Sequence, residues 1–348
     1  MHTYLVTGGA GFIGANFIKY IFRKHGRNIS IVNLDKLTYA GNLASLADME
    51  GEKGYHFIKG DICDRKLVKE VFASYDIDYV VNFAAESHVD RSITEPDVFI
   101  RTNIMGTQVL LDEARLAWET GYGYPVNRKF LQVSTDEVYG SLGSEGYFSE
   151  NTPVNPHSPY SASKAGADMI VQAYYDTYGL PVNITRCSNN YGPYQFPEKL
   201  IPLLIRNCLR GISLPVYGDG RNVRDWLYVE DHCAAIDLVL RAGKAGQVYN
   251  IGGNNERQNI EIVNTVINML NVLLEDSDRR KSKINASLIK YVEDRKGHDR
   301  RYAIDAGKIM DELGWKPAKG FDDGIKETVQ WYLNNEAWLE NVQREIFG

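Results

Sequence analysis

Thr3-Tyr-Leu-Val-Thr-Gly-Gly-Ala-Gly-Phe-Ile-Gly14 is the stretch of sequence that best predicts the fold. Its apolar start is typical of a short buried strand, and the apolar positions that follow recur with helical spacing. Gly8 permits a tight turn, Gly11 lets the backbone approach a pyrophosphate, and Gly14 allows the helix to pack closely on the strand. The helix would then point its unpaired N–H groups at the phosphates. The stretch predicts a dinucleotide-binding strand–turn–helix unit.

An acidic residue stands at the end of the second predicted strand, residues 31–35, and lies 21 residues after Gly14. A carboxylate at this position accepts hydrogen bonds from the adenosine ribose hydroxyls and repels a 2′-phosphate. Asp35 therefore favours NAD over NADP. The alternative is a purely structural role, in which Asp35 only caps the turn that follows it.

Further apolar runs predict more strands of the same sheet, at residues 56–62, 79–85, 130–133 and 182–186. The run at 79–85 is apolar without interruption, which is typical of a parallel strand buried on both faces. Because these runs alternate with helical patterns, they predict an α/β fold with a Rossmann-like, doubly wound parallel sheet. Asp61, at the end of the third run, is a candidate partner for the adenine amino group.

A change of composition near residue 188 predicts a second domain. Residues 1–188 read as the NAD-binding Rossmann domain, and 189–348 as a smaller mixed α/β domain with loops punctuated by Pro and Gly. Within the second part, 225–240 is predicted as a helix and 247–253 as a strand. We expect residues 225–255 to return in part to the first domain.

Three polar side chains follow the run at 130–133, namely Thr135, Asp136 and Glu137. The carboxyl end of a strand is where open α/β sheets place their ligands. Two adjacent carboxylates at that edge suit general acid–base chemistry, since a shared cleft drives their pKa values apart. The alternative is that they begin a helix, where carboxylates suit the first turn.

Tyr160 and Lys164 are four residues apart, so on a helix they share one face. A lysine ammonium beside a phenol favours the phenolate and should lower the tyrosine pKa from about 10. Such a tyrosine could take a proton from an alcohol. A lone Tyr-x-x-x-Lys is a weak signal, but its occurrence with the glycine turn and the carboxylate pair predicts an active site.

Composition argues against several other classes of protein. The 45 acidic and 39 basic residues give a net charge of −6, which offers no reason to expect nucleic acid or an anionic membrane as partner. No apolar run approaches the roughly 20 residues of a membrane span. The four cysteines form no C-x-x-C pair or metal-ligand spacing, so we expect no metal, and buried free thiols in the cytoplasm.

Two predicted helices, at 102–118 and from Tyr160 onward, carry more apolar surface than one sheet face needs. Packing within one chain explains this almost as well as a subunit contact. The apolar surplus nevertheless predicts a homodimer that associates through a shared helical bundle.

Taken together and in this order, these residues resemble the extended short-chain dehydrogenase/reductase family over essentially the whole chain. Within the family, the chain is most similar to the 4,6-dehydratases of nucleotide sugars. Five stretches carry this finer resemblance, namely Asp35-Lys-Leu-Thr-Tyr-Ala-Gly-Asn-Leu43, Glu86-Ser-His-Val-Asp-Arg-Ser92, Thr135-Asp-Glu-Val-Tyr-Gly140, Arg224-Asp-Trp226 and Arg295-Lys-Gly-His-Asp299.

The resemblance implies an NAD-dependent hydro-lyase that converts dTDP-glucose to dTDP-4-keto-6-deoxyglucose, a precursor of deoxysugars such as dTDP-rhamnose. It implies that Tyr160 takes the proton of the glucose 4-hydroxyl, Thr135 holds that oxygen and Lys164 also grips the nicotinamide ribose. Glu137 would then remove the C5 proton while Asp136 protonates the departing 6-hydroxyl. The same bound cofactor would return the hydride to C6.

The resemblance also implies two sets of binding residues. For NAD they are Gly8, Gly11, Phe12, Ile13, Gly14, Asp35, Lys36, Leu37, Thr38, Asp61, Ile62, Phe83, Ala84, Ala85, Ser87, Thr102, Tyr160, Lys164 and Asn190. For the nucleotide sugar they are Ser87, Thr135, Asn189, Glu198, Lys199, Leu200, Pro215, Tyr217, Arg224, Asn259, Arg295 and His298.

Other functions remain open at the level of sequence. A nucleotide-sugar 4-epimerase needs the same glycine turn, Tyr160 and Lys164, but has no use for Asp136 and Glu137. A 4,6-dehydratase acting on a GDP- or UDP-sugar is not distinguished by any of these residues. A non-catalytic NAD-sensing or scaffold protein would keep the glycines without needing the rest.

Overall fold

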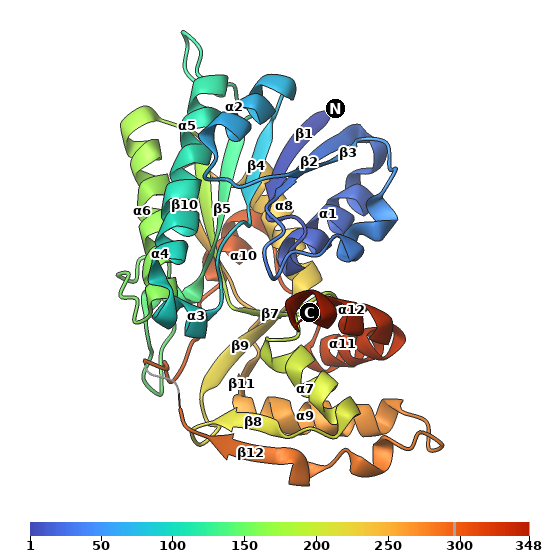
Figure 1. Cartoon of the computed structure of the whole chain (residues 1–348). Coiled ribbons are helices and arrows are strands. Elements are labelled where there is room, and N and C mark those ends of the chain that lie inside the picture. Colours follow the sequence, from blue (N-terminus) through green and yellow to red (C-terminus); the bar gives the residue numbers. More distant parts are fainter. Residues whose placement is uncertain (295–296, 348) are drawn as a thin grey trace.

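A seven-stranded parallel sheet forms the upper part of the computed structural model, which describes residues 1–294 and 297–347 (Figure 1). The strand order is β3-β2-β1-β4-β5-β6-β10, so the winding reverses between β1 and β4. This confirms the predicted Rossmann-like, doubly wound sheet. The strands are β1 (His2–Thr7), β2 (Ile29–Asp35), β3 (Tyr55–Lys59), β4 (Tyr79–Asn82), β5 (Lys129–Thr135), β6 (Val182–Cys187) and β10 (Gln247–Ile251).

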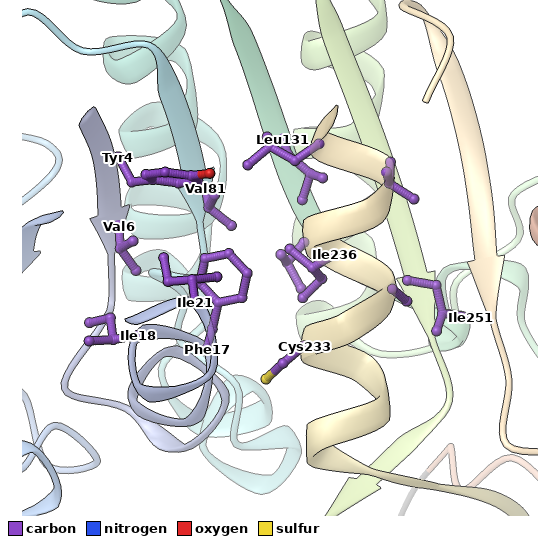
Figure 2. Packing of buried hydrophobic residues seen from close by; sticks show 14 of the residues in the cluster. Tyr4, Val6, Phe17, Ile18, Ile21, Val81, Leu131, Cys233, Ile236 and Ile251 are labelled. Atoms are coloured by element: carbon purple, nitrogen blue, oxygen red, sulfur yellow. The ribbon is translucent and has the colours of Figure 1, made fainter. Parts of the chain in front are cut away.

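Helices cover both faces of this sheet because its strands are apolar on both sides. Figure 2 shows one face, where side chains of α1 and α8, among them Phe17 and Ile236, pack against Val6, Val81 and Leu131 of the strands. The first face carries α1 (Phe12–His25), α8 (Val229–Ala242) and α10 (Gly307–Leu313), and the second carries α2 (Arg65–Ser74), α5 (Thr107–Trp118) and α6 (Pro159–Tyr178).

A second lobe lies below the carboxyl ends of the strands (Figure 1). It has its own core, in which Leu204, Trp226, Ile262 and Ile325 are buried. Its strands form a three-stranded sheet of β7 (Asn189–Tyr191), β9 (Val223–Tyr228) and β11 (Glu256–Gln258), and a pair of β8 (Leu214–Tyr217) and β12 (Ile289–Val292). Its helices are α7 (Leu200–Arg210), α9 (Asn259–Leu273), α11 (Phe321–Asn334) and α12 (Glu336–Phe347).

The return of the chain to the first sheet follows the sequence prediction in part. Residues 247–251 form β10, which pairs in parallel with β6. The prediction of a helix from residue 225 was wrong, because Asp225 to Tyr228 belong to β9 and pair with β7 and β11. The division at residue 188 into two domains stays a prediction.

Two other elements differ from their predicted ranges. The third and fourth strands end earlier than predicted, at Lys59 and Asn82, since the next residues turn into the walls of a cavity. The helix expected from residue 102 begins as the π-helical segment η3 (Ile100–Gly106) and becomes regular only in α5. Within it, the Thr107 hydroxyl donates to the Asn103 carbonyl at 2.7 Å and so competes with the normal helix ladder.

Short helical pieces complete the described chain. Two are α-helical, α3 (Val89–Thr94) and α4 (Pro96–Phe99), and five are 3-10 turns at Gly26–Asn28, Leu43–Met49, Asp136–Tyr139, Lys281–Lys283 and Ala286–Leu288. Among the helices of residues 1–294 and 297–347, none combines the length and apolar character that a membrane crossing needs.

Candidate active site

The carboxyl ends of the parallel strands open into a cavity of about 320 Å³. The cavity lies where the strand order reverses between β1 and β4, the place at which open α/β sheets bind ligands. Gly8, Asp35 and Tyr160 line it from the side of the sheet, and Asn189 and Glu198 from the segment that leads into the second lobe. The site is therefore shared between the two parts of the chain.

The residues predicted to bind NAD lie together around this cavity, with one exception. Leu37 does not line it, because its backbone has a φ of 54° and its N–H donates to Asp35 Oδ1 at 2.7 Å, which closes a turn. The lining residues are Gly8, Gly11, Phe12, Ile13, Gly14, Asp35, Lys36, Thr38, Asp61, Ile62, Phe83, Ala84, Ala85, Ser87, Thr102, Tyr160, Lys164 and Asn190.

The glycine turn between β1 and α1 leaves no room for side chains. Gly8 has a φ of 67°, and a Cβ there would lie 2.7 Å from the Ala84 backbone nitrogen. A Cβ on Gly14 would lie 2.4 Å from the Gly8 carbonyl oxygen. Gly11 caps α1 without a side-chain hydrogen bond, so the first turn of the helix faces the cavity unblocked. A phosphate can approach this turn as predicted.

Asp35 lies at the end of β2 and is buried. Its carboxylate accepts hydrogen bonds from the Leu37 N–H and from the Ala10 N–H, the latter at 2.8 Å. Burial raises the pKa of this carboxyl, and the two backbone hydrogen bonds act against that rise. Asp35 therefore caps a turn and also lines the cavity, and its contact with the adenosine ribose stays a prediction.

Asp61 and Lys36 form an ion pair at the edge of the same cavity, with 2.9 Å between Nζ and Oδ2. Burial acts to raise the pKa of Asp61, but hydrogen bonds from the Cys63 N–H and from Lys36 outweigh it and lower that pKa. The pair fixes the rim of the cavity on the β3 side.

The carboxylate pair follows β5 on a single 3-10 turn. The Thr135 hydroxyl donates to Asp136 Oδ1 at 3.3 Å, whereas the buried Oδ2 of Asp136 has no hydrogen-bond partner. Burial, the charge of Glu137 and the charge of Asp225 raise the pKa of Asp136 well above its usual value, against the opposing charge of Arg224. The protonated form of Asp136 is therefore favoured, while Glu137 is only partly buried.

Tyr160 and Lys164 lie in the first two turns of α6, as predicted. Ser158 and Ser161 form a capping box that fixes the start of this helix. Lys164 is 4% exposed and its Nζ donates to the Val133 carbonyl oxygen at 2.7 Å. Burial lowers the pKa of Lys164, although Asp168 and Cys187 act to raise it.

The pKa of Tyr160 is shifted in the direction opposite to the predicted one. Burial and then the negative charge of Glu137 raise the pKa of Tyr160 well above 10, and a hydrogen bond with Thr135 opposes this only in part. Burial of the phenol dominates, and the Lys164 ammonium donates to the Val133 carbonyl of β5. In this structure Tyr160 is a neutral phenol.

The residues predicted to bind the nucleotide sugar fall into two groups. Ser87, Thr135, Asn189, Glu198 and Lys199 line the cavity. The others lie in the second lobe outside its wall, namely Leu200 at the start of α7, Pro215 and Tyr217 in β8, Arg224 in β9, Asn259 at the start of α9, and His298. Arg295 lies outside the described residues.

Arg224 is buried between the lobe and the carboxylate pair. Its Nη2 donates to the Asp299 carbonyl at 2.9 Å, and its guanidinium lies 4.2 Å from the centre of the Tyr302 ring. Its positive charge lowers the pKa of Asp136, so Arg224 also acts on the acid of the site. Tyr217 and His298 also belong to the second lobe, and their ring centres lie 6.4 Å apart.

Sequence reasoning missed Asn103, which lies in the π-helical segment η3 and is buried. Its side chain accepts from the Glu86 N–H at 2.9 Å and donates to the Glu86 carbonyl and the Ser163 hydroxyl. Ser163 in turn donates to the Tyr160 carbonyl at 2.7 Å. Asn103 thus joins the loop after β4 to the start of α6, and no local signal in the sequence sets it apart from the other polar residues of this helix.

Tyr302 was also missed, although it follows a stretch that carried the family resemblance. Its hydroxyl donates to Asp299 Oδ2 at 2.6 Å, and Asp299 Oδ1 contacts His157 Nδ1 at 2.6 Å. Burial and the charge of Glu137 raise the pKa of Tyr302. The tyrosine is therefore part of the electrostatic surroundings of Glu137.

These features fit a bound NAD molecule. The glycine turn leaves space where a phosphate must approach, Asp35 offers a carboxylate at the end of β2, and Lys164 and Tyr160 line the same cavity. In the part of the chain that the structure describes, no group of His, Cys, Asp and Glu side chains could hold a metal ion.

Comparison with known proteins gives a consistent result. The family described as GDP-mannose 4,6 dehydratase matches residues 5–328. The dTDP-glucose 4,6-dehydratase of Xanthomonas campestris pv. campestris (strain B100) is 56% identical over 346 residues, which cover 98% of this chain and 96% of that protein.

Two crystal structures share both sequence and fold with the chain. The dTDP-glucose 4,6-dehydratase of Bacillus anthracis, in complex with NAD, is 49% identical with a TM-score of 0.86, covering 98% of this chain and 100% of that one. The dTDP-glucose 4,6-dehydratase of Streptomyces venezuelae, with NAD and a second ligand bound, is 46% identical with a TM-score of 0.89, covering 98% and 99%.

Proposed function

This chain belongs to the GDP-mannose 4,6-dehydratase family of extended short-chain dehydrogenase/reductases, and from that premise we propose that it dehydrates dTDP-glucose to dTDP-4-keto-6-deoxyglucose. Relatives named dTDP-glucose 4,6-dehydratase, which are 46–56% identical to this chain, support this substrate. The NAD held by the two crystallised relatives supports the cofactor. The reaction makes the chain a hydro-lyase.

One observation about the site carries the proposal. Asp136 is a buried acid whose Oδ2 has no hydrogen-bond partner and whose pKa is raised, and Glu137 follows it on the same turn. Elimination of water needs a protonated acid and an ionised base at the same time. Oxidation and reduction at C4 alone, as in an epimerase, would need neither.

The first step belongs to Tyr160, Thr135 and Lys164. Tyr160 takes the proton of the glucose 4-hydroxyl, and the Thr135 hydroxyl binds the same oxygen. NAD, when bound, supplies the acceptor for the C4 hydride, the donor that returns it to C6, and a positive charge that favours the Tyr160 phenolate. Lys164 is held in place by its hydrogen bond to the Val133 carbonyl and would contact the nicotinamide ribose.

The second step belongs to the carboxylate pair. The ketone at C4 acidifies the C5 hydrogen, which Glu137 removes as a proton. Asp136 donates its proton to the 6-hydroxyl, so the C6–O bond breaks and water leaves. The loss of H⁺ from C5 and of OH⁻ from C6 leaves a C5–C6 double bond that is ready for reduction.

The nucleotide would be held by the second lobe. We propose that Arg224 contacts the diphosphate, since an arginine fork binds phosphate oxygens at two points, and that Tyr217 stacks on the thymine. Leu200, Pro215, Asn259, Arg295 and His298 complete this proposed site, while Ser87, Asn189, Glu198 and Lys199 would contact the sugar and the neighbouring phosphates.

One experiment separates this function from its rivals. The purified protein is incubated with dTDP-, UDP- and GDP-hexoses and the products are weighed by mass spectrometry. We expect loss of one water from dTDP-glucose, and in D₂O a deuterium at C5 with the C4 hydrogen transferred to C6. Loss of water from another nucleotide sugar would move the substrate to GDP or UDP, and a 4-epimer as sole product would indicate an epimerase.

Three broader features are part of the proposal. We propose a homodimer, because apolar side chains on the outer face of the α5–α6 layer are exposed. They are Ile100, Met105, Leu116, Met169 and Tyr178. We place the protein in the cytoplasm, since its four cysteines are all free thiols, namely Cys63, Cys187, Cys208 and Cys233. We also propose that its product serves the synthesis of deoxysugars such as dTDP-rhamnose.

A further inference from the structure

Tyr39 lies beside the cavity without lining it, while its neighbours Thr38 and Ala40 are part of the wall. The Arg91 guanidinium lies 4.4 Å from the centre of its ring, and the Phe196 ring meets it edge-on at 5.6 Å. Its hydroxyl donates to Glu198 Oε1 at 3.2 Å. The ring is thus held between two side chains and its polar end points at a carboxylate of the cavity.

The segment that carries Tyr39 is fixed to the dinucleotide turn at both ends. Leu37 donates its N–H to Asp35, and the Asn42 N–H donates to the Ala10 carbonyl at 2.9 Å. Between them, the Gly41 N–H closes a turn on the Thr38 carbonyl at 3.0 Å. The position of Tyr39 is therefore set by the same residues that form the adenosine end of the cavity.

Glu198 and Lys199 are neighbours in the cavity wall but do not form a close ion pair. Lys199 Nζ lies 3.9 Å from Glu198 Oε1, and it donates instead to the Ser87 carbonyl at 3.0 Å. Glu198 Oε2 lies 3.5 Å from His88 Nε2. The oxygens of Glu198 thus have three polar neighbours, namely a phenol hydroxyl, an imidazole and an ammonium group.

The Tyr39 hydroxyl occupies the oxygen of Glu198 that faces Lys199. We propose that Tyr39 is a positioning residue that fixes the orientation of the Glu198 carboxylate, so that this group can contact the sugar nucleotide. Because Tyr39 is anchored through Asp35 and Ala10, it also joins the sugar end of the site to the NAD-binding segment. This inference rests on the proposed function.

Without the hydroxyl, Glu198 Oε1 loses this hydrogen-bond donor. The carboxylate can then turn toward its other polar neighbours, His88 and Lys199. A substrate would have to turn the carboxylate back before it could bind. The defect should appear mainly in KM for the nucleotide sugar, because the groups of Asp136 and Tyr160 that carry the chemistry are not moved.

The test compares Tyr39 with a second tyrosine whose hydroxyl also donates to a glutamate carboxylate. Tyr228 donates its hydroxyl to Glu327 Oε2, also at 3.2 Å, and lies outside the cavity wall. We expect Tyr39→Phe to raise KM for dTDP-glucose about 10- to 100-fold, the range for a lost hydrogen bond to a charged group, with kcat changed less than about threefold. Tyr228→Phe should leave both constants unchanged, and both variants should retain NAD. Equal kinetics for the two variants would overturn the proposal.

A double-mutant cycle with Glu198→Ala tests the partner. In that background Tyr39→Phe should have no further effect on kcat/KM, because the carboxylate that it positions is gone. The same fold loss in both backgrounds would mean that the hydroxyl acts elsewhere, and the inference would fail. A parent protein that removes no water from dTDP-glucose refutes the proposed function instead, and the cycle is then run with the nucleotide sugar that it converts.

Discussion

At Asp136, burial and the neighbouring charge of Glu137 both raise the pKa of the carboxyl. A carboxylate transferred out of water loses hydration, and the negative charge of Glu137 adds repulsion, so the neutral form is favoured. Glu137 is more open to the cavity and has the protons of Tyr302 and Tyr160 in its surroundings. The two adjacent side chains thus have different environments, which is the condition for one to act as acid and the other as base.

The first prediction concerns this division of roles. Asp136→Asn and Glu137→Gln should still reduce bound NAD when dTDP-glucose is added, because C4 oxidation uses Tyr160 and Lys164. Each should form the 4-keto-6-deoxy product about 10²- to 10⁴-fold more slowly, the usual effect of a lost general acid or base. Absorbance of NADH and mass spectrometry of the sugar measure the two steps separately. A parental rate of dehydration in Glu137→Gln would contradict the assignment.

The second prediction concerns Arg224. Arg224→Ala should weaken dTDP binding by roughly 1.5–3 kcal/mol, the value of a charge-assisted contact. Arg224→Lys keeps the charge and loses the planar fork, so its binding should fall between alanine and parent. Calorimetric titration with dTDP gives the affinities, and thermal unfolding of the same variants shows whether the fold is intact. Unchanged binding by a folded Arg224→Ala variant would remove Arg224 from the diphosphate site.

The element that was easiest to predict from sequence is the unit of β1, the glycine turn and α1. Its signals are local, because turn, helix start and apolar stripe all lie within residues 2–25. Residues 225–228 were misassigned since their strand exists only through pairing with β7 and β11, which are distant in sequence. The π-helical turn around Asn103 and the raised pKa of Tyr160 likewise depend on tertiary contacts and burial that no periodicity records.

The third prediction concerns the packing of α1 on the glycine turn. Alanine suits a helix interior better than glycine by about 1 kcal/mol, but a Cβ at residue 14 would lie 2.4 Å from a backbone oxygen that cannot move alone. Gly14→Ala should therefore shift the start of α1 away from Gly8 and lower the NAD content of the purified protein. Gly121→Ala is the matched control, because a Cβ there meets nothing within 4 Å. Equal NAD content in both variants would refute this reasoning.

For the molecule as a whole, the site depends on the meeting of the two lobes. Tyr160 and the carboxylate pair come from the sheet, whereas Glu198 and Lys199 come from the segment that leads into the second lobe. Before its last two helices, α11 and α12, the chain returns to the sheet, where Ile309 and Trp315 pack into the core that Figure 2 shows in part. These crossings connect the lobes at several points of the chain.

The last prediction concerns association between molecules. Leu116 on α5 and Met169 on α6 are each 59% exposed, and burying such apolar surface against a second copy is favourable. Light scattering at micromolar concentration should give the mass of a dimer for the parent. A glutamate placed at such an interface would be desolvated without a partner, so Met169→Glu and Leu116→Glu should shift the mass to that of a monomer. Val272→Glu, at a position on α9 that is 74% exposed and far from this face, should remain dimeric. A monomeric parent would rule out the dimer, and a dimer that survives both substitutions would place its interface elsewhere.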